Sequence, residues 1–148
     1  MNKKYLIVFS AAFLVALLDQ LTKFIIRKNM KFNESVPIIK DIFHLTYVTN
    51  TGSAFGLFKG FNLFFVLFSI AVIIGIFYYL RRNINEKEKF LQLAIGLLLG
   101  GTIGNMIDRI IYGAVTDFID FRIWPVFNAA DSAVTVSVII LIILLWKK

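Results

Sequence analysis

The chain has 148 residues, of which 59% are hydrophobic and only 17% are charged, and its formal net charge is +7. A soluble domain of this size rarely carries so much apolar surface, so the composition indicates an integral membrane protein. There is no cysteine and only one histidine, which excludes disulfides, thiolate metal sites and a His-rich metal cluster and disfavours a conventional Ser-His-Asp triad. We expect no metal and no cofactor, and we assign the positive charge to helix orientation and lipid headgroups rather than to nucleic acid.

The first apolar run, residues 5–26, follows two lysines, as the apolar stretch of a cleaved signal peptide would. The run continues into the polar stretch 19–23, and no small-residue cleavage pattern follows its centre, so we expect it to remain as a helix. Three more apolar runs cover residues 61–80, 90–111 and 127–146. Each run has about 20 residues, the length that crosses a ~30 Å hydrocarbon core at ~1.5 Å per residue. The predicted fold is a single all-α integral membrane domain, residues 1–148, with four transmembrane helices.

The connection between the first and second runs, residues 27–60, is too long for a simple turn. Its stretch 38–49 is rich in Ile, Phe, Tyr, Val and Thr, with Pro37 before it and Asn-Thr-Gly after it. This pattern predicts one or two short β-strands that end in a turn, with aromatic side chains on the membrane surface. The one histidine, His44, is expected to be a loop or interface residue.

Lysine and arginine residues near the ends of the apolar runs predict the orientation of the chain. Two lysines precede the first run, four cations lie between the second and third runs, and two lysines end the chain. The connection between the third and fourth runs, residues 112–126, has only Arg122. Three cations within residues 27–31 argue weakly the other way. Because cytoplasmic segments carry the excess of cations, both termini are expected in the cytoplasm and the 27–60 loop outside.

Ionisable and amide side chains gather at the predicted outer ends of the helices. Such residues are costly inside a membrane, so each is a candidate functional residue. They come from the first helix, the third helix, the start of the fourth helix and the two outer connections, all at one membrane depth. The residues are Asp19, Lys23, Asn50, Asn105, Asp108, Arg109, Asp117, Asn128 and Asp131.

The third run also carries glycines at every fourth position, Gly96, Gly100 and Gly104. A stripe of small residues lets two helices approach closely, and most such stripes serve packing alone. Here that packing would bring the polar end of the third helix against its neighbours.

Asp117 and Asp131 lie on either side of one short connection, and a tight return would bring their carboxyl groups together. Two carboxyl groups in contact share a proton, because both cannot ionise cheaply. The ionised one can take a proton from water while the protonated one hydrogen-bonds a scissile carbonyl, which is the chemistry of an aspartic peptidase. Asp131 is expected in the first turn of a helix, where the helix dipole favours the ionised form.

A purely structural interpretation explains the same residues. In it, Asp131 is a helix-start residue with Asn128 as the N-cap, while Asp117 and Asp120 are solvated loop residues. The sequence alone leaves both interpretations open. The pairs Asp19–Lys23 and Asp108–Arg109 fit charge-compensating structural groups better than catalysts.

A serine–lysine peptidase is a further possibility, with Ser53 or Ser132 as nucleophile and Lys23 as base. It requires a neutral lysine, whereas Lys23 has an acidic partner four residues away, so this option is disfavoured.

Five segments, in order and on the expected helices and loops, resemble the bacterial lipoprotein signal peptidase family, also called signal peptidase II. The resemblance extends over nearly the whole chain. Each segment alone is weakly specific, but the five together are specific. They are DQLTK at 19–23, NTGSAF at 50–55, GGTIGNMIDR at 100–109, GAVTDF at 113–118 and FNAADS at 127–132.

The resemblance implies a membrane aspartic endopeptidase of the bacterial inner membrane, with its site near the extracytoplasmic face. Its substrates would be prolipoproteins whose lipobox cysteine carries a diacylglyceryl group, cut on the N-terminal side of that cysteine. It also implies binding of globomycin-type inhibitors, contact with membrane lipid, and a small extracytoplasmic β-cradle with a short interfacial helix; we expect a monomer.

The resemblance also assigns roles to individual residues. Asp117 and Asp131 match the catalytic pair of the family. Substrate-binding positions match Asn50, Asn105, Arg109 and Asn128, and positions that support the site match Asp19, Lys23, Gly104 and Asp108.

Two competing functions come from other classes of protein. A small proton or ion transporter would also bury charged residues, but its polar groups should extend through the whole membrane depth, whereas here they lie at one end. A non-enzymatic membrane scaffold would explain the glycine stripe but not the grouped carboxylates.

Overall fold

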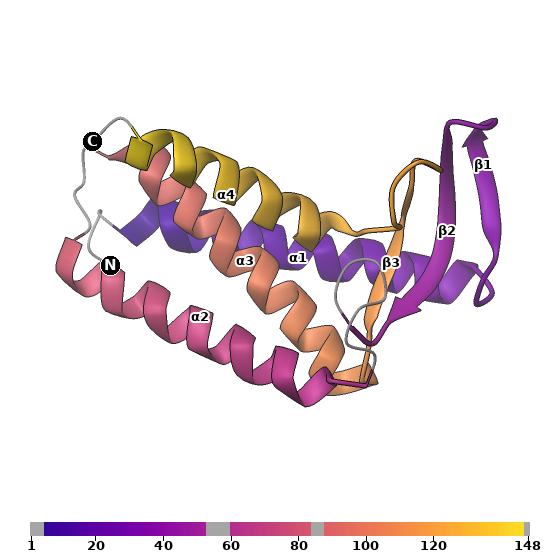
Figure 1. Ribbon diagram of the computed structural model, residues 1–148, viewed down its shortest axis with the longest axis horizontal. Helices are drawn as coiled ribbons and strands as arrows, with labels where there is room; N and C mark the ends of the chain where they lie inside the picture. Colours follow the sequence, from indigo (N-terminus) through magenta and orange to yellow (C-terminus); the bar gives the residue numbers. More distant parts are fainter. Residues whose placement is uncertain (1–4, 53–59, 84–87, 147–148) are drawn as a thin grey trace.

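The structure, a computed structural model, describes residues 5–52, 60–83 and 88–146. Its four helices run side by side, and a small sheet lies at the end where α1 finishes and α4 begins (Figure 1). The helices are α1 (Leu6–Asn29), α2 (Asn62–Asn83), α3 (Lys89–Tyr112) and α4 (Ala129–Trp146), and the strands are β1 (Ser35–Ile39), β2 (Phe43–Asn50) and β3 (Val115–Asp120).

Three of the four helices are long and apolar enough to cross a membrane: α1, α2 over Asn62–Arg82, and α3. Their outward faces expose large apolar side chains, such as Phe13 on α1 and Leu63 on α2, as lipid-facing helices do. The fourth helix has 18 residues and is the shortest. Its crossing of the membrane therefore remains a prediction.

The glycines of α3 let this helix pack closely against both α1 and α4. A Cβ atom at Gly100 would lie 2.6 Å from the carbonyl oxygen of Ala12 in α1, and one at Gly101 would lie 2.6 Å from that of Ala130 in α4. These distances are too short for any side chain, so only glycine permits this approach of the backbones. The predicted packing role of the stripe is confirmed, and it makes α3 the central helix.

The sheet is antiparallel in the order β1-β2-β3. Two strands occur between the first two helices, as expected, but β1 begins at Ser35 and includes Pro37, before the predicted stretch 38–49. No helix occurs in residues 30–52 and 60–61 of this loop, and the remainder, 53–59, lies outside the described residues, as does the candidate nucleophile Ser53. His44 lies on β2, where its Nδ1 is 3.1 Å from Ser35 Oγ.

The third strand was not predicted. Residues 115–120 were expected in a loop, but they pair with β2 and are almost entirely buried. Asp117 and Asp120 are 2% and 4% exposed, so the interpretation of both as solvated loop residues is wrong. Aspartate is unfavourable in strands unless its carboxylate is hydrogen-bonded, and here each carboxylate accepts side-chain hydrogen bonds.

Candidate active site

Asp117 and Asp131 reach one cleft from two different elements. Asp117 is on the buried strand β3, and Asp131 is in the first turn of α4. Both line a cleft of about 790 Å³, together with Asn50 from the end of β2 and Arg109 from α3. A tight return was expected between the third and fourth helices, and the strand β3 forms part of it.

Asn128 connects the two carboxyl groups. Its Nδ2 donates to Asp117 Oδ1 at 2.6 Å, and its backbone N–H donates to Asp131 Oδ2 at 3.2 Å. In return, the backbone N–H of Asp131 donates to Asn128 Oδ1 at 2.9 Å. This reciprocal arrangement is a capping box, so the predicted N-cap role of Asn128 is confirmed. Capping and contact with the carboxylates are thus performed by the same residue.

The ionisation of Asp117 is perturbed by its surroundings. Burial is the main cause that raises the pKa of its carboxyl, to about 7, and the nearby charge of Asp131 raises it further. Hydrogen bonds from Asn128 and Asn50 and the positive charge of Lys23 oppose this increase in pKa. A carboxyl group that titrates near neutral pH can keep or lose its proton under physiological conditions, as acid–base catalysis requires.

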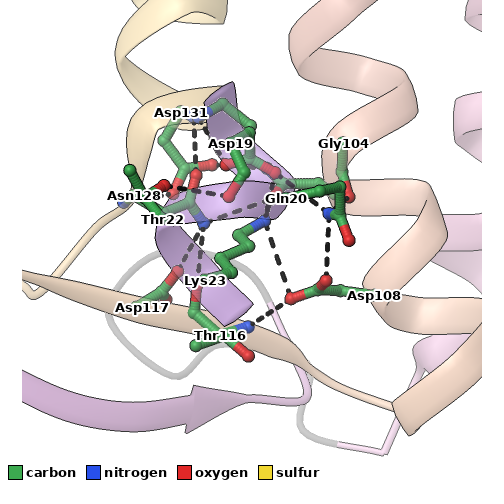
Figure 2. Close-up of polar contacts among 12 residues, drawn as sticks. Asp19, Gln20, Thr22, Lys23, Gly104, Asp108, Thr116, Asp117, Asn128 and Asp131 are labelled. Carbon is green, nitrogen blue, oxygen red and sulfur yellow. Dashed lines mark hydrogen bonds and ion pairs between the residues drawn. The ribbon is translucent and has the colours of Figure 1, made fainter. Parts of the chain in front are cut away.

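A buried ionic cluster lies behind the pair (Figure 2). Lys23 Nζ is 2.8 Å from Asp19 Oδ2 and 3.6 Å from Asp108 Oδ2, and none of the three side chains is exposed. Asp19 Oδ1 also accepts the backbone N–H of Ala130 at 2.9 Å, which attaches α1 to the start of α4. The pairing predicted for Asp19 and Lys23 is confirmed. These two ion pairs already occupy the Lys23 amine, which disfavours it as the base of a serine–lysine peptidase.

Asp108 pairs differently from the prediction. Its carboxylate contacts Lys23 and Arg27 of α1 rather than the adjacent Arg109, because neighbouring residues of a helix point in different directions. It also accepts the backbone N–H of Thr116 at 2.8 Å, which attaches β3 to α3.

Arg109 points into the cleft instead. Its Nη2 donates to the carbonyl of Gly52 at 3.3 Å, and its guanidinium lies 5.0 Å from the ring centre of Phe65. Its Nε is buried without a hydrogen-bond partner among the described residues. A buried guanidinium N–H without an acceptor is costly, so this group is suited to donate a hydrogen bond to a ligand carbonyl or carboxylate.

The polar residues predicted to bind substrate fall into two groups. Asn50 and Arg109 line the cleft, whereas Asn105 and Asn128 lie behind the carboxylates and are not among the lining residues. Asn105 Nδ2 donates to Asp131 Oδ1 at 2.7 Å, and Asn128 is completely buried. The second pair is therefore placed to hold the carboxylates.

Sequence reasoning missed three residues of this network. Arg27 Nη1 donates to Thr116 Oγ1 at 2.9 Å, and Gln20 Nε2 donates to the carbonyl of Gly104 at 3.0 Å and to Asp108 at 3.1 Å. Arg27 lies one turn beyond Lys23 and two turns beyond Asp19, so its helical spacing was a usable signal. No spacing in the sequence indicated Thr116.

The walls of the cleft are largely apolar. Aromatic rings and aliphatic side chains surround the polar floor that holds the carboxylates. These residues are Phe65, Phe121, Trp124, Val126, Phe127, Val134 and Val136. The arrangement suits a substrate with a short polar reacting segment and large apolar flanks.

Comparison with known proteins identifies the family to which the chain is similar. Residues 11–147 match the family model described as signal peptidase (SPase) II. Lipoprotein signal peptidases of Halothermothrix orenii and Bacillus subtilis are both 46% identical to the chain; the first match covers 95% of this chain and 96% of that protein, the second 89% and 88%. A solved bacterial membrane enzyme, 39% identical, superposes with a TM-score of 0.91 over 99% of this chain and 93% of its own.

Proposed function

This chain belongs to the signal peptidase II family and is a lipoprotein signal peptidase, and we propose that Asp117 and Asp131 are its catalytic pair. The observation that carries this proposal is the placement of two buried carboxyl groups, from different elements, in one cleft and on one bridging amide. The membrane protease activity of the family requires a group that activates water and a group that polarises a carbonyl. A transporter is not supported by the relatives from Halothermothrix orenii and Bacillus subtilis, both of which are named as lipoprotein signal peptidases.

The proposed reaction needs only this pair and a water molecule. One carboxylate removes a proton from water, and the water oxygen attacks the scissile carbonyl. The other, protonated carboxyl donates a hydrogen bond to the carbonyl oxygen, where negative charge develops. The proton taken from water then passes to the nitrogen of the leaving amine, and the peptide bond breaks.

The proposed substrate is a prolipoprotein whose lipobox cysteine carries a diacylglyceryl group. Each buried methylene of an acyl chain contributes ~0.8 kcal/mol to membrane anchoring, so the lipid keeps the scissile bond near the headgroups. The apolar walls of the cleft, such as Phe121 and Trp124, offer a surface for such a substrate. Cleavage would occur on the N-terminal side of the cysteine.

Asn50 and Arg109 are the proposed substrate contacts, because they line the cleft beside the carboxylates. A peptide must be extended to be cut, and its free carbonyl and N–H groups need partners in a dry site. Asn105 and Asn128 serve instead as positioning residues, and Asp19, Lys23, Gly104 and Asp108 support them. A globomycin-type peptide inhibitor would occupy the same cleft.

The proposed topology places four helices across the inner membrane of a bacterium, with both termini in the cytoplasm and the sheet outside. At ~1.5 Å per residue α4 spans about 27 Å, slightly less than a ~30 Å hydrocarbon core. Its first turn holds Asp131, so the site would lie close to the outer headgroup boundary. The protein is expected to act as a monomer.

The decisive experiment measures cleavage of a diacylglyceryl-modified precursor by purified Asp117→Asn and Asp131→Asn variants. Each change keeps the shape of the side chain but removes its acid–base function. Both variants should insert and fold normally yet lose all measurable turnover. Asp41→Asn is the matched control, because Asp41 is an exposed residue in the turn between β1 and β2, and its activity should stay normal. Substantial turnover by either site variant would rule out the catalytic pair.

A further inference from the structure

The two carboxyl groups do not receive equivalent hydrogen bonds. Asp131 accepts on both oxygens, from Asn105 Nδ2 at 2.7 Å and from the backbone N–H of Asn128 at 3.2 Å. Asp117 accepts a short hydrogen bond on Oδ1 from Asn128, but the Asn50 donor that faces its Oδ2 is 3.4 Å away. Since donated hydrogen bonds favour the ionised form, Asp131 is the better-stabilised anion, and Oδ2 of Asp117 has room for a proton.

Lys23 fixes the direction of the stronger of the Asp131 hydrogen bonds. An ammonium group can only donate, so Asn105 must turn its Oδ1 toward Lys23 Nζ, at 2.9 Å. The Nδ2 of the same amide then necessarily faces Asp131. The opposite orientation would place an amide NH₂ against the ammonium and a carbonyl against the carboxylate. Lys23 is itself held by the buried carboxylates of Asp19 and Asp108.

We propose that Lys23, acting through the side-chain amide of Asn105, holds Asp131 as the ionised carboxylate that activates water and leaves Asp117 to carry the proton. The inference rests on the proposed catalytic pair and assigns a distinct task to each member. Lys23 is a positioning residue in this arrangement, because its side chain is completely buried and is not among the residues that line the cleft.

The other charged groups around the pair do not produce the same asymmetry. Arg109 of α3 lines the cleft with both carboxyl groups, so its charge acts on each of them. Asp19 of α1 and Asp108 of α3 are negative and are paired with Lys23. A single side-chain amide, that of Asn105, connects the Lys23 ammonium to Asp131 by hydrogen bonds. The path from Lys23 to Asp117 needs two amides, Asn105 and then Asn128.

The test is the pH dependence of kcat/KM for a diacylglyceryl-modified precursor in detergent–lipid micelles. Activity falls at low pH when the base becomes protonated and at high pH when the acid loses its proton. Asn105→Ser removes the donor to Asp131, because a serine hydroxyl is too short to replace it. The acid limb of the profile should move to higher pH by about one unit, and the alkaline limb should stay in place.

A second variant tests Lys23 itself. Lys23→Met alone would leave Asp19 buried and unpaired, so it is combined with Asp19→Asn, whose amide oxygen can still accept the Ala130 N–H. The double variant should also move the acid limb to higher pH. Asp19→Asn alone is the control; it keeps the ammonium and removes a negative charge near Asp131, so its acid limb should stay or move to lower pH.

Each outcome distinguishes the inference from the proposed function. A shift of the alkaline limb in Asn105→Ser, with an unchanged acid limb, would assign the base to Asp117 and overturn the inference. A lower rate with both limbs unmoved, in Asn105→Ser or in the double variant, would make the network merely structural and overturn it as well. Turnover by Asp117→Asn or Asp131→Asn would instead overturn the catalytic pair.

Discussion

Asn128 donates a hydrogen bond of 2.6 Å from its side-chain amide to Asp117, although it is also the residue that caps α4. It is completely buried, so both functions depend on a side chain that water does not reach. Asn is one of the best N-cap residues, but Ser caps nearly as well with a shorter side chain. The two functions of Asn128 can therefore be separated by substitution.

We predict that Asn128→Ser retains most of the stability of the protein but loses about 10²-fold in kcat/KM, as expected when a donor to a reacting group is removed. Asn128→Ala should lose the cap as well, at a cost of about 1 kcal/mol in the free energy of unfolding. Thermal unfolding and precursor cleavage, measured on both variants, check this. Near-normal turnover by Asn128→Ser would show that capping is the only function of this residue.

Gly104 has a specific steric reason to be glycine. A Cβ atom at this position would lie 2.5 Å from Asp19 Oδ2, inside the buried ion pair with Lys23. Gly104→Ala should therefore displace the Asp19 carboxylate, lower the free energy of unfolding by about 1–3 kcal/mol and reduce turnover.

Gly75→Ala is the matched control for this substitution. Gly75 is in α2, and a Cβ atom there meets nothing within 4 Å. The change should leave turnover unchanged and stabilise the helix by up to about 1 kcal/mol. If both variants unfolded at the same temperature, the close contact at Gly104 would have no energetic consequence.

Local spacing predicted the parts of the site that lie within one helix or at a helix start. The i, i+4 pair Asp19–Lys23 and the Asn-x-x-Asp pattern of Asn128 and Asp131 both act over short distances along the chain, and the structure contains both contacts. The helix limits were also close, since an apolar run of membrane-spanning length has few alternative structures.

Contacts between elements were less predictable. The strand β3 holds two aspartates that local propensity places in a loop, and only pairing with β2 and hydrogen bonds from other elements make it a buried strand. Asp108 was assigned to its sequence neighbour Arg109, yet its ion-pair partners come from α1. Helix packing selects these partners, and a single sequence does not encode them locally.

Arg27 gives a third prediction, because it connects α1 to both α3 and β3. Its guanidinium contacts Asp108 and Thr116 and lies 4.4 Å from the ring centre of Tyr112. Arg27→Gln should lower the free energy of unfolding by about 2 kcal/mol, the range of hydrogen bonds to charged groups, and should reduce turnover by loosening the strand that carries Asp117. Unfolding temperature and kcat/KM measured together check this.

The neighbouring Lys28 provides the control for this variant. Its side chain is exposed at the end of the same helix, so Lys28→Gln removes one positive charge without touching β3. Stability and turnover should both stay close to normal. Equal losses in the two variants would point to the overall charge of the segment rather than to the contacts of Arg27.

The raised pKa of Asp117 predicts how stability changes with pH. An unfolded aspartate has a pKa of about 3.9, whereas burial and the charge of Asp131 raise the pKa of Asp117 to about 7. Between these values the folded protein holds a proton that the unfolded chain has lost, so this carboxyl makes the fold less stable as pH rises. Asp117→Asn removes the effect. The variant should unfold at a higher temperature than the parent protein at pH 7–8, and the difference should shrink toward pH 4.

Asp120 is the internal control, because it lies on the same strand with the opposite shift. Burial raises the pKa of its carboxyl, but hydrogen bonds from Thr46 and Arg122 and the charge of Arg122 outweigh burial and lower it. Its stabilising effect is present above the unfolded pKa of about 3.9 and is lost as pH falls through the lower folded value. Asp120→Asn should therefore be less stable than the parent protein at pH 7. The difference in stability should vanish only at acid pH, where Asp120 is protonated in both the folded and the unfolded parent. Thermal unfolding of both variants from pH 3 to 8 should give differences of opposite sign at neutral pH, and differences of the same sign would contradict the raised pKa of Asp117.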